Sequence, residues 1–248
     1  MPKFFTSHEN IKGNTIIIDS EDAAHITKVL RLGKEDIITV CDGKGTDYIV
    51  KISEIESNRI ICDVEDKRKC ETESELEVTL YQGLPKGSKM DYIIQKTTEL
   101  GIKRIVPVAM SRCVVKLENK KAEEKKQQRW QKIAAEAAKQ SGRGIIPEVA
   151  MPVTLDRAIE ELKSKDLAFA PYECEENNRI RDVLTSETDI KSAGFIIGPE
   201  GGFDLTEIEK IKESGIKPVT LGKRILRTET AGEAVLAMVM YEKGDINA

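Results

Sequence analysis

Cysteine pairs, histidine and tryptophan are scarce in this sequence of 248 residues. It has two histidines and one tryptophan, and its five cysteines stand far apart with no CxxC pair: Cys41, Cys62, Cys70, Cys113 and Cys174. An odd, scattered set is typical of free thiols in a reducing compartment rather than of disulfides or a zinc site. We therefore expect neither disulfide bonds nor a metal centre.

Long hydrophobic runs are also missing. No uninterrupted apolar stretch approaches the ~20 residues that a helix needs to span a bilayer. The N-terminal stretch MPKFFTSHENIKG has neither the apolar core nor the small-residue cleavage site of a secretory signal. We expect a cytoplasmic protein with no membrane partner.

Positive charge is scarce overall but concentrated in one third of the chain. The formal net charge is −4; residues 1–75 carry −5 and residues 151–248 carry −6, whereas residues 76–150 carry +7. A local basic excess can hold an anionic polymer. A solvated helix face is the alternative for four of the lysines: Lys120, Lys121, Lys125 and Lys126. Other basic residues stand among glycines and short loops: Lys86, Lys89, Arg112, Lys116 and Arg143.

The first 70 residues predict a small β domain. Four β-branched runs are broken by Gly and Asp turns, at 15–19, 37–42, 47–53 and 59–64. Such closely spaced strands favour a small barrel or sandwich, with one short helix at about 20–31. The acidic stretch 65–77 is polar and aperiodic, as linkers are, so we expect domains at 1–72 and 73–248.

From residue 77 the pattern changes to strands that alternate with helices. Strands are expected at 77–84, 102–109, 166–172, 194–201 and 217–222. Helices are expected at about 87–100, 121–141, 154–164, 204–214 and 229–242. This alternation predicts an α/β domain with a parallel sheet flanked by helices.

A glycine-rich stretch, Gly198-Pro199-Glu200-Gly201-Gly202, lies where an apolar strand gives way to a helix with Asp204 as its expected N-cap. Glycines let the backbone approach a ligand closely, and a helix N-terminus offers free N–H groups. An ordinary tight turn is the alternative. The stretch matches neither GxGxxG nor GxxxxGK[ST], so it does not indicate a nucleotide-phosphate site.

Two arginines, Arg224 and Arg227, follow the strand that is expected to end at Leu221-Gly222. Open α/β sheets bind ligands at this edge, which makes Arg227 a candidate; surface charge is the alternative. The next helix is expected near Thr230, where Thr230 and Glu233 have the form of a capping box. That helix is apolar almost all round, which predicts burial against the sheet or against a partner subunit.

The long helix that contains Trp130 ends in a polar, basic loop. Trp130, the sole tryptophan, is expected in the core or at an interface. In the loop, Gln140 and Arg143 are either contacts to phosphates or bases of a nucleic acid or parts of an ordinary helix C-cap. The sequence alone leaves both readings open.

The helix at about 87–100 has candidates at both ends. Lys86 and Lys89 stand at its start. Glu99 lies in its last turn, where a carboxylate opposes the helix dipole. This mild electrostatic cost marks Glu99 as a candidate functional residue.

Four stretches together resemble the signature segments of the 16S ribosomal RNA uridine-N3 methyltransferases of the SPOUT superfamily: 95–101, 136–143, 198–203 and 221–231. Residues 24–32 are similar to the opening of that family's PUA-like RNA-binding domain, so the resemblance covers nearly the full length. The sequence departs from the family pattern at Lys34-Glu35-Asp36, where a Gly-Asp turn is expected.

The resemblance implies a fold, a cofactor and an assembly. The α/β domain should contain a deep trefoil knot, S-adenosylmethionine should sit bent within it, and a homodimer should act on 16S rRNA in the small ribosomal subunit. The residues expected around the cofactor are Ala170, Pro171, Ile197, Gly198, Pro199, Glu200, Gly201, Leu221, Gly222, Ile225, Leu226 and Thr230.

Methylation at uridine N3 requires loss of the N3 proton, which spreads negative charge onto O2 and O4. An arginine beside these oxygens would stabilise that charge, a role expected of Arg227. A carboxylate, Glu99 or Glu229, could take the proton. RNA contacts are expected from Arg31, Lys86, Lys89, Arg112, Gln140, Arg143 and Arg224.

Two other classes of function compete with this one. A non-catalytic RNA-binding protein could use a PUA-like domain and a knotted dimerisation domain without methyl transfer. A nucleotide-dependent enzyme on a Rossmann-type sheet is weakened by the missing phosphate-binding motifs.

Overall fold

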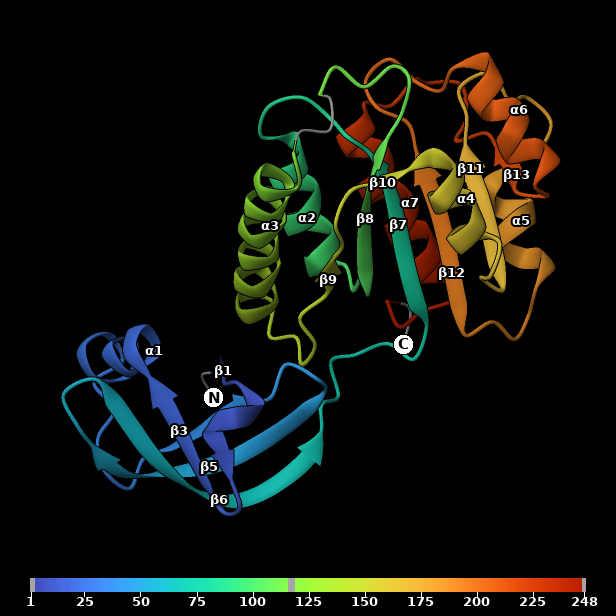
Figure 1. The fold of residues 1–248 in the computed structure, drawn as a ribbon. Coiled ribbons are helices and arrows are strands. Elements are labelled where there is room, and N and C mark those ends of the chain that lie inside the picture. The colour runs from blue at the N-terminus through green and yellow to red at the C-terminus, as the bar shows by residue number, and fades with distance from the viewer. Residues whose placement is uncertain (1–2, 116–118, 247–248) are drawn as a thin grey trace. The chain divides into compact units, whose positions relative to one another are not determined.

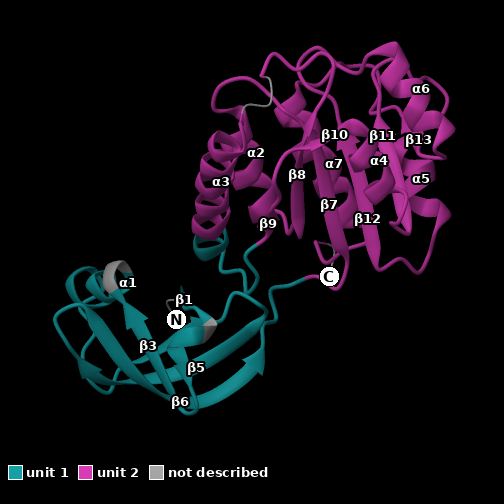
Figure 2. Cartoon of the chain, in the orientation of Figure 1, with its two compact units in different colours: residues 1–73, 138–146 teal, residues 74–137, 147–248 magenta. Residues whose placement is uncertain are grey.

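The computed structural model describes residues 3–115 and 119–246 (Figure 1). The chain forms two compact units: residues 1–73 with 138–146 are unit 1, and residues 74–137 with 147–248 are unit 2 (Figure 2). Lys116 lies outside the described residues. Among the helices that these residues form, none is long and apolar enough to cross a membrane.

Unit 1 is built on a six-stranded sheet in the order β1-β4-β5-β6-β3-β2. Its strands are β1 (Lys3–Phe5), β2 (Ile11–Lys12), β3 (Thr15–Asp19), β4 (Ile37–Cys41), β5 (Thr46–Ile55) and β6 (Arg59–Lys69), with a 3-10 turn, η1 (His8–Asn10). Ile16 and Ile18 of β3 are fully buried because side chains two residues apart share one face of a strand. The four predicted strands are confirmed.

Two expectations for unit 1 are corrected. The acidic stretch 65–77 is not a linker throughout, because β6 continues to Lys69 and pairs with β5 there. The helix expected at 20–31 is a short α1 (Ser20–Ala24) followed by a π-helical turn, η2 (His25–Val29). Nearby, Glu35 adopts a φ of 74°, a conformation that glycine reaches without strain, at the position where the chain departs from the family pattern.

Unit 2 contains a parallel sheet in the order β10-β8-β7-β12-β11-β13, with β9 also paired to β8. Its strands are β7 (Glu77–Gly83), β8 (Arg104–Ala109), β9 (Glu148–Val149), β10 (Val153–Thr154), β11 (Leu167–Pro171), β12 (Ser192–Ile197) and β13 (Lys217–Val219). The predicted parallel α/β class is confirmed. The trefoil knot concerns how the chain threads, and it stays a prediction.

Helices cover both faces of this sheet. They are α2 (Lys89–Glu99), α3 (Lys120–Gln140), α4 (Leu155–Leu162), α5 (Ile180–Ser186), α6 (Leu205–Glu213) and α7 (Thr228–Glu242). Adjacent residues of β7 point to opposite faces, Leu80 towards Gly232 of α7 and Tyr81 towards the face that Leu162 of α4 covers. In Figure 1, α4 accordingly lies in front of the sheet and α7 behind it. Trp130 is buried in this unit's core, as expected.

The ends of the helices differ from expectation at one point and agree at another. Asp204 is the N-cap of α6, as predicted, and forms a capping box with Glu207. The last helix, however, begins at Thr228 rather than near Thr230, and its N-cap, Arg227, makes no side-chain capping hydrogen bond. Thr230 and Glu233 therefore form no capping box there; Glu233 instead accepts a hydrogen bond from the Tyr92 hydroxyl of α2.

Candidate active site

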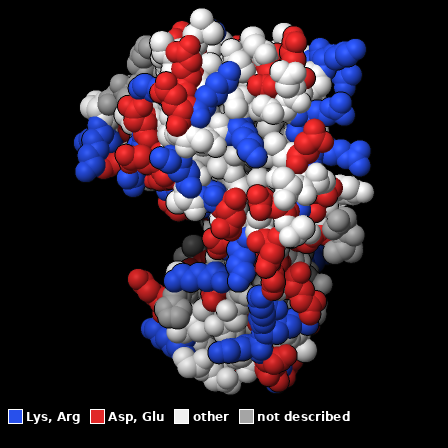
Figure 3. Space-filling model, turned by 90° about the vertical axis from the view of Figure 1, so that its right-hand side faces the viewer, with Lys and Arg blue, Asp and Glu red and all other residues white. Residues whose placement is uncertain are grey.

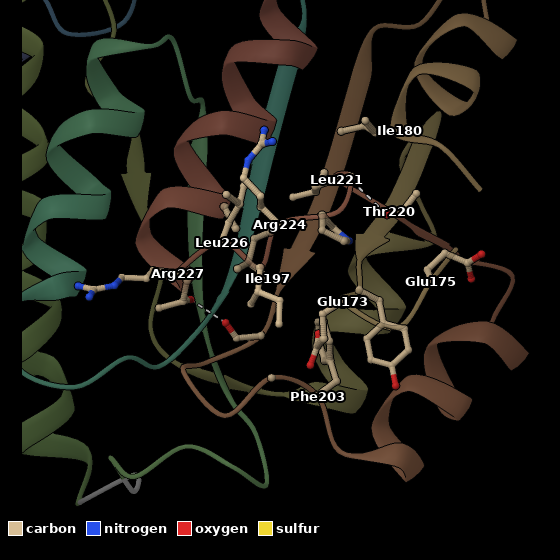
Figure 4. Close-up of a pocket in the computed structure, with 18 of the residues that line it drawn as sticks. Glu173, Glu175, Ile180, Ile197, Phe203, Thr220, Leu221, Arg224, Leu226 and Arg227 are labelled. Atoms are coloured by element: carbon tan, nitrogen blue, oxygen red, sulfur yellow. Dashed lines mark hydrogen bonds between the residues drawn. The ribbon is translucent and has the colours of Figure 1, made fainter. Parts of the chain in front are cut away.

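A cavity of about 1140 Å³ lies at the carboxyl edge of the unit 2 sheet (Figure 4). Three loops build it: the first follows β11, the second follows β12, and the third joins β13 to α7. The strand ends bring these loops together, because Pro171 is in register with Val219, and Ile197 with Gln82. This is the edge at which open α/β sheets bind ligands.

The loop after β12 is packed closer to its surroundings than side chains would allow. A Cβ on Gly83, at the end of β7, would lie 2.6 Å from the nitrogen of Pro199. A Cβ on Gly198 would lie 3.1 Å from the carbonyl carbon of Gly202. Gly202 has a φ of +67°, and a Cβ there would collide with the Glu173 carboxylate. Glycines therefore fold this loop into a tight turn whose backbone forms the cavity wall.

A buried chain of hydrogen bonds joins this loop to the start of α7. The Gln82 amide donates to the Thr228 hydroxyl at 2.8 Å, and that hydroxyl donates to the Gly198 carbonyl at 2.6 Å. Gln82 is fully buried and Thr228 is 6% exposed. Neither residue was a candidate from the sequence, because Gln82 and Thr228 are 146 positions apart and their contact cannot be read from the 221–231 segment that contains Thr228.

An ion-pair network stands beside the same loop. The Lys89 ammonium lies 3.1 Å from the Glu200 carboxylate and 3.2 Å from that of Glu229. Burial opposes the charge on Glu200, but the Lys86 N–H and the Lys89 ammonium hold the pKa of that carboxyl below its ordinary value. Burial likewise opposes the charge on Lys89, yet the two carboxylates keep the pKa of its ammonium raised.

The third loop presents backbone donors. Within the described part of the chain, the N–H groups of residues 223–227 donate no hydrogen bond to another residue. Leu221 and Leu226 are half-buried there, whereas Ile225 is 84% exposed. In Figure 4 the Arg227 side chain runs away from the other labelled side chains of the cavity, on the side where α2 lies. Its guanidinium is exposed.

Nine of the twelve residues expected around the cofactor line the cavity: Pro171, Ile197, Gly198, Pro199, Glu200, Leu221, Gly222, Ile225 and Leu226. Ala170, Gly201 and Thr230 do not line it. Ala170 is fully buried in β11. A Cβ on Gly201 would face the Arg112 side chain at 3.1 Å, so this glycine leaves room for Arg112 rather than for a ligand.

The three candidate catalytic residues are not brought together. Arg227 lines the cavity. Glu229 is the second residue of α7 and is paired with Lys89. Glu99 ends α2, the helix that begins beside the cavity, and both of its carboxylate oxygens accept from Lys96 at 3.0 and 2.9 Å. The structure therefore does not support Glu99 as a base at this cavity.

The seven residues expected to contact RNA are distributed over both units. Lys89 and Arg224 line the cavity, and Lys86 is exposed next to it. Arg112 is engaged, since it donates to the Gly201 carbonyl at 2.9 Å. Arg31 and Gln140 are exposed in unit 1.

The expectation that Arg143 contacts RNA is corrected. Its guanidinium side chain is 5% exposed and binds the Glu73 carboxylate through two nitrogens, at 3.3 and 2.7 Å. Glu73 also accepts the N–H groups of Gly144 and Ile145. A buried, paired guanidinium fixes the 138–146 segment within unit 1 and is not available to RNA phosphates.

Replacing Arg143 with alanine should lower the free energy of unfolding by about 3 kcal/mol, because it leaves the buried Glu73 carboxylate without its counter-charge. Urea unfolding followed by circular dichroism measures this loss. Replacing the exposed neighbour Gln140 with alanine is the control and should change stability by less than about 0.5 kcal/mol. An Arg143→Ala protein of unchanged stability but weakened RNA binding would restore Arg143 as an RNA contact.

Surface charge is mixed on the face shown in Figure 3. Lys and Arg side chains are interspersed with Asp and Glu on each unit there, rather than gathered into one broad patch. Individual basic residues beside the cavity, rather than net charge, are the features to test.

Comparison with known proteins gives the class of this chain. Residues 72–240 match the RNA methyltransferase domain family, and residues 18–65 match the RNA methyltransferase PUA domain family. A parallel α/β sheet with a loop-built cavity at its carboxyl edge, preceded by a small β unit, is thus the fold of an RNA methyltransferase.

Full-length relatives narrow the class to one family. The chain is 33% identical to ribosomal RNA small subunit methyltransferase E of Bacillus subtilis, over 98% of this chain and 97% of that one. The crystal structure of the enzyme of that name from Neisseria gonorrhoeae, bound to S-adenosylmethionine, is 32% identical with a TM-score of 0.87 over 99% of both chains. A Legionella pneumophila protein solved with the same cofactor is 30% identical, with a TM-score of 0.85 over 99% of both. The chain belongs to the ribosomal RNA small subunit methyltransferase E family.

Proposed function

We propose that this chain transfers a methyl group from S-adenosylmethionine to N3 of a uridine in the 16S rRNA of the small ribosomal subunit. The observation that carries the proposal is the cavity at the carboxyl edge of an RNA methyltransferase domain, walled by the backbone of the loops after β12 and β13. Because its substrate in this proposal is ribosomal RNA, the protein would act in the cytoplasm.

The residues around the cavity suit S-adenosylmethionine. Ligand pockets commonly enclose about 300–1,000 Å³, so about 1140 Å³ accommodates the cofactor and part of a nucleotide. The free N–H groups of residues 223–227 match the acceptor edge of adenine, and Leu221 and Leu226 offer apolar contact to its ring. The Glu173 carboxylate, which lines the cavity, matches the positive charge of the cofactor.

The chemistry asks three things of the protein. When bound, the cofactor supplies a methyl group activated by its sulfonium. The chain must hold uridine N3 in line with it, stabilise the charge that develops on O2 and O4, and accept the N3 proton. Arg227 is the charge-stabilising group. Glu229, two residues further on, is the better-placed carboxylate for the proton, and its ion pair with Lys89 must loosen before it can accept.

The functional unit in this proposal is a homodimer. On α7 the side chains of Met238 and Tyr241 are 39% and 60% exposed, and Tyr92 on the adjacent α2 is 43% exposed. Large apolar side chains exposed on two packed helices support a partner subunit at this surface.

Calorimetric titration with S-adenosylmethionine in the presence of EDTA tests the cofactor assignment. We expect stoichiometric binding without any divalent ion, since the described residues hold no group of three His, Cys, Asp or Glu side chains that could bind a metal. Binding that appears only after a divalent ion is added would contradict this. Cofactor binding with no methyl transfer to any RNA would favour the non-catalytic alternative.

RNA affinity should depend on exposed cations beside the cavity. Replacing Lys86 and Arg224 together with alanine should weaken RNA binding and lower the slope of log K against log salt by about two, because two fewer phosphates are neutralised. Filter binding at several salt concentrations measures this slope. Replacing Lys120 and Lys121 with alanine, on a solvent-facing turn of α3, is the matched control. Equal slopes in the two double variants would count against the cavity rim as the RNA contact.

A further inference from the structure

The side chains of Gln82 and Thr228 link β7, the loop after β12 and α7, and only one arrangement of donors and acceptors satisfies their hydrogen bonds. The Gln82 side-chain nitrogen donates both to the Gly83 carbonyl at 3.0 Å and to the Thr228 hydroxyl at 2.8 Å. Reversing the amide would place its oxygen against the Gly83 carbonyl, acceptor against acceptor. The Thr228 hydroxyl therefore accepts from Gln82, and its own hydrogen goes to the Gly198 carbonyl at 2.6 Å.

This orientation is kept although it leaves the Gln82 side-chain oxygen buried with no hydrogen-bond partner in the described structure. A buried acceptor without a partner destabilises a fold by about 1–3 kcal/mol. No cost of this kind is needed merely to fill space between β7 and α7, for which an apolar side chain of similar shape would serve. The benefit of this orientation is that the Gln82 side-chain nitrogen donates to the Thr228 hydroxyl.

These hydrogen bonds connect two parts of the proposed active site, the loop after β12 and the start of α7. Gly198 begins the loop that walls the cavity, and Gly83 packs against that loop from the other side. Thr228 directly follows Arg227 and is the first residue of α7. A single hydroxyl thus joins the cofactor loop to the backbone that carries the candidate catalytic arginine.

We propose that Thr228 is a positioning residue whose hydroxyl, oriented by Gln82, fixes the Gly198 carbonyl and Arg227 relative to each other. The inference rests on the proposed function. Gln82 and Thr228 are both buried, so bulk water competes little for the bond in the wild-type protein. Loss of the hydroxyl leaves the Gly198 carbonyl without its donor and lets the cofactor loop shift away from α7.

Replacing Thr228 with valine, which keeps the shape and removes the hydroxyl, is the test. We expect S-adenosylmethionine to bind about tenfold or more weakly, the effect of one buried hydrogen bond. The kcat should also fall, whereas the KM for RNA should stay near the wild-type value. Thr228→Ser, which restores the hydroxyl, should recover most of the affinity and rate.

Thr97→Val is the matched control. Thr97 is also fully buried in unit 2 and its hydroxyl also donates at 2.6 Å to a backbone carbonyl, that of Ile93, but within α2. It should lower thermal stability without changing cofactor affinity or kcat. Gln82→Met approaches the same bond from its other end: it keeps the length of the side chain but removes the donor that orients the Thr228 hydroxyl, so it should weaken cofactor binding, though less than Thr228→Val does.

A Thr228→Val protein with wild-type cofactor affinity and kcat would overturn the inference. Equal losses in Thr228→Ser and Thr228→Val would overturn it as well, since packing rather than the hydroxyl would then matter. If Thr228→Val does not fold, Thr228→Ser and Gln82→Met decide the question in the same way. A wild-type protein that binds no S-adenosylmethionine would instead contradict the proposed function.

Discussion

Replacing Arg227 with alanine should lower kcat by roughly 10²–10³, the loss typical of one electrostatic donor to a developing negative charge. Binding of S-adenosylmethionine should remain close to normal, because Arg227 is exposed and its side chain points away from the cavity interior (Figure 4). A contribution made only as N3 loses its proton belongs to the transition state and therefore appears in kcat. Single-turnover methylation with saturating cofactor measures it.

Arg227→Lys is the companion variant. It should recover only part of the rate, because an ammonium lacks the planar fork that can bridge the two uridine oxygens. If Arg227 instead holds the loop or a dimer contact, the alanine variant should lose thermal stability or dimerisation together with cofactor affinity. A folded, dimeric Arg227→Ala protein that methylates at the wild-type rate would end the assignment.

Replacing Gly202 with alanine should lower methyl transfer by roughly 10²-fold, the cost of a displacement of about 1 Å at a positioning loop. Gly202 combines a φ of +67° with a Cβ position occupied by the Glu173 carboxylate, so either the loop after β12 or the exposed Glu173 side chain must shift, and both line the cavity. The affinity for S-adenosylmethionine, measured by calorimetric titration, should fall as well.

Gly215→Ala separates backbone strain from crowding at the site. Gly215 has a φ of +85°, but a Cβ there would meet nothing within 4 Å and would lie outside the cavity. Both variants should lose about 1–2 kcal/mol of stability from the left-handed conformation. Only Gly202→Ala should lose cofactor binding. Equal binding in the two variants would mean that the Gly198–Gly202 turn is structural.

The sequence predicted those parts of the site that local patterns encode. Glycines after an apolar strand mark Gly198 and Gly222, and a strand end places Leu221 and Arg227 at the carboxyl edge, because parallel strands end together. The same locality explains the confirmed strands and the Asp204 cap. Such features need no knowledge of what packs against them.

Contacts between residues far apart in the sequence could not be predicted from local patterns. The pairing of Arg143 with Glu73 joins positions 70 residues apart, so a basic residue in a polar loop looked like an RNA contact. The bond between Gln82 and Thr228 is of the same kind. Glu99 stays an untested candidate that the structure does not support: an unfavourable place in the helix dipole marks a residue as unusual but does not say which edge of the sheet the helix end reaches.

The nucleoside that receives the methyl group tests the central claim most directly. The wild-type protein would be incubated with S-adenosylmethionine labelled in its methyl group and with 16S rRNA, both free and in small ribosomal subunits, and the RNA digested to nucleosides. We expect the label in 3-methyluridine at a single position. Label in another nucleoside would contradict the N3 assignment, and no label in either substrate, with the cofactor bound, would contradict the account of this cavity as a methyltransferase active site.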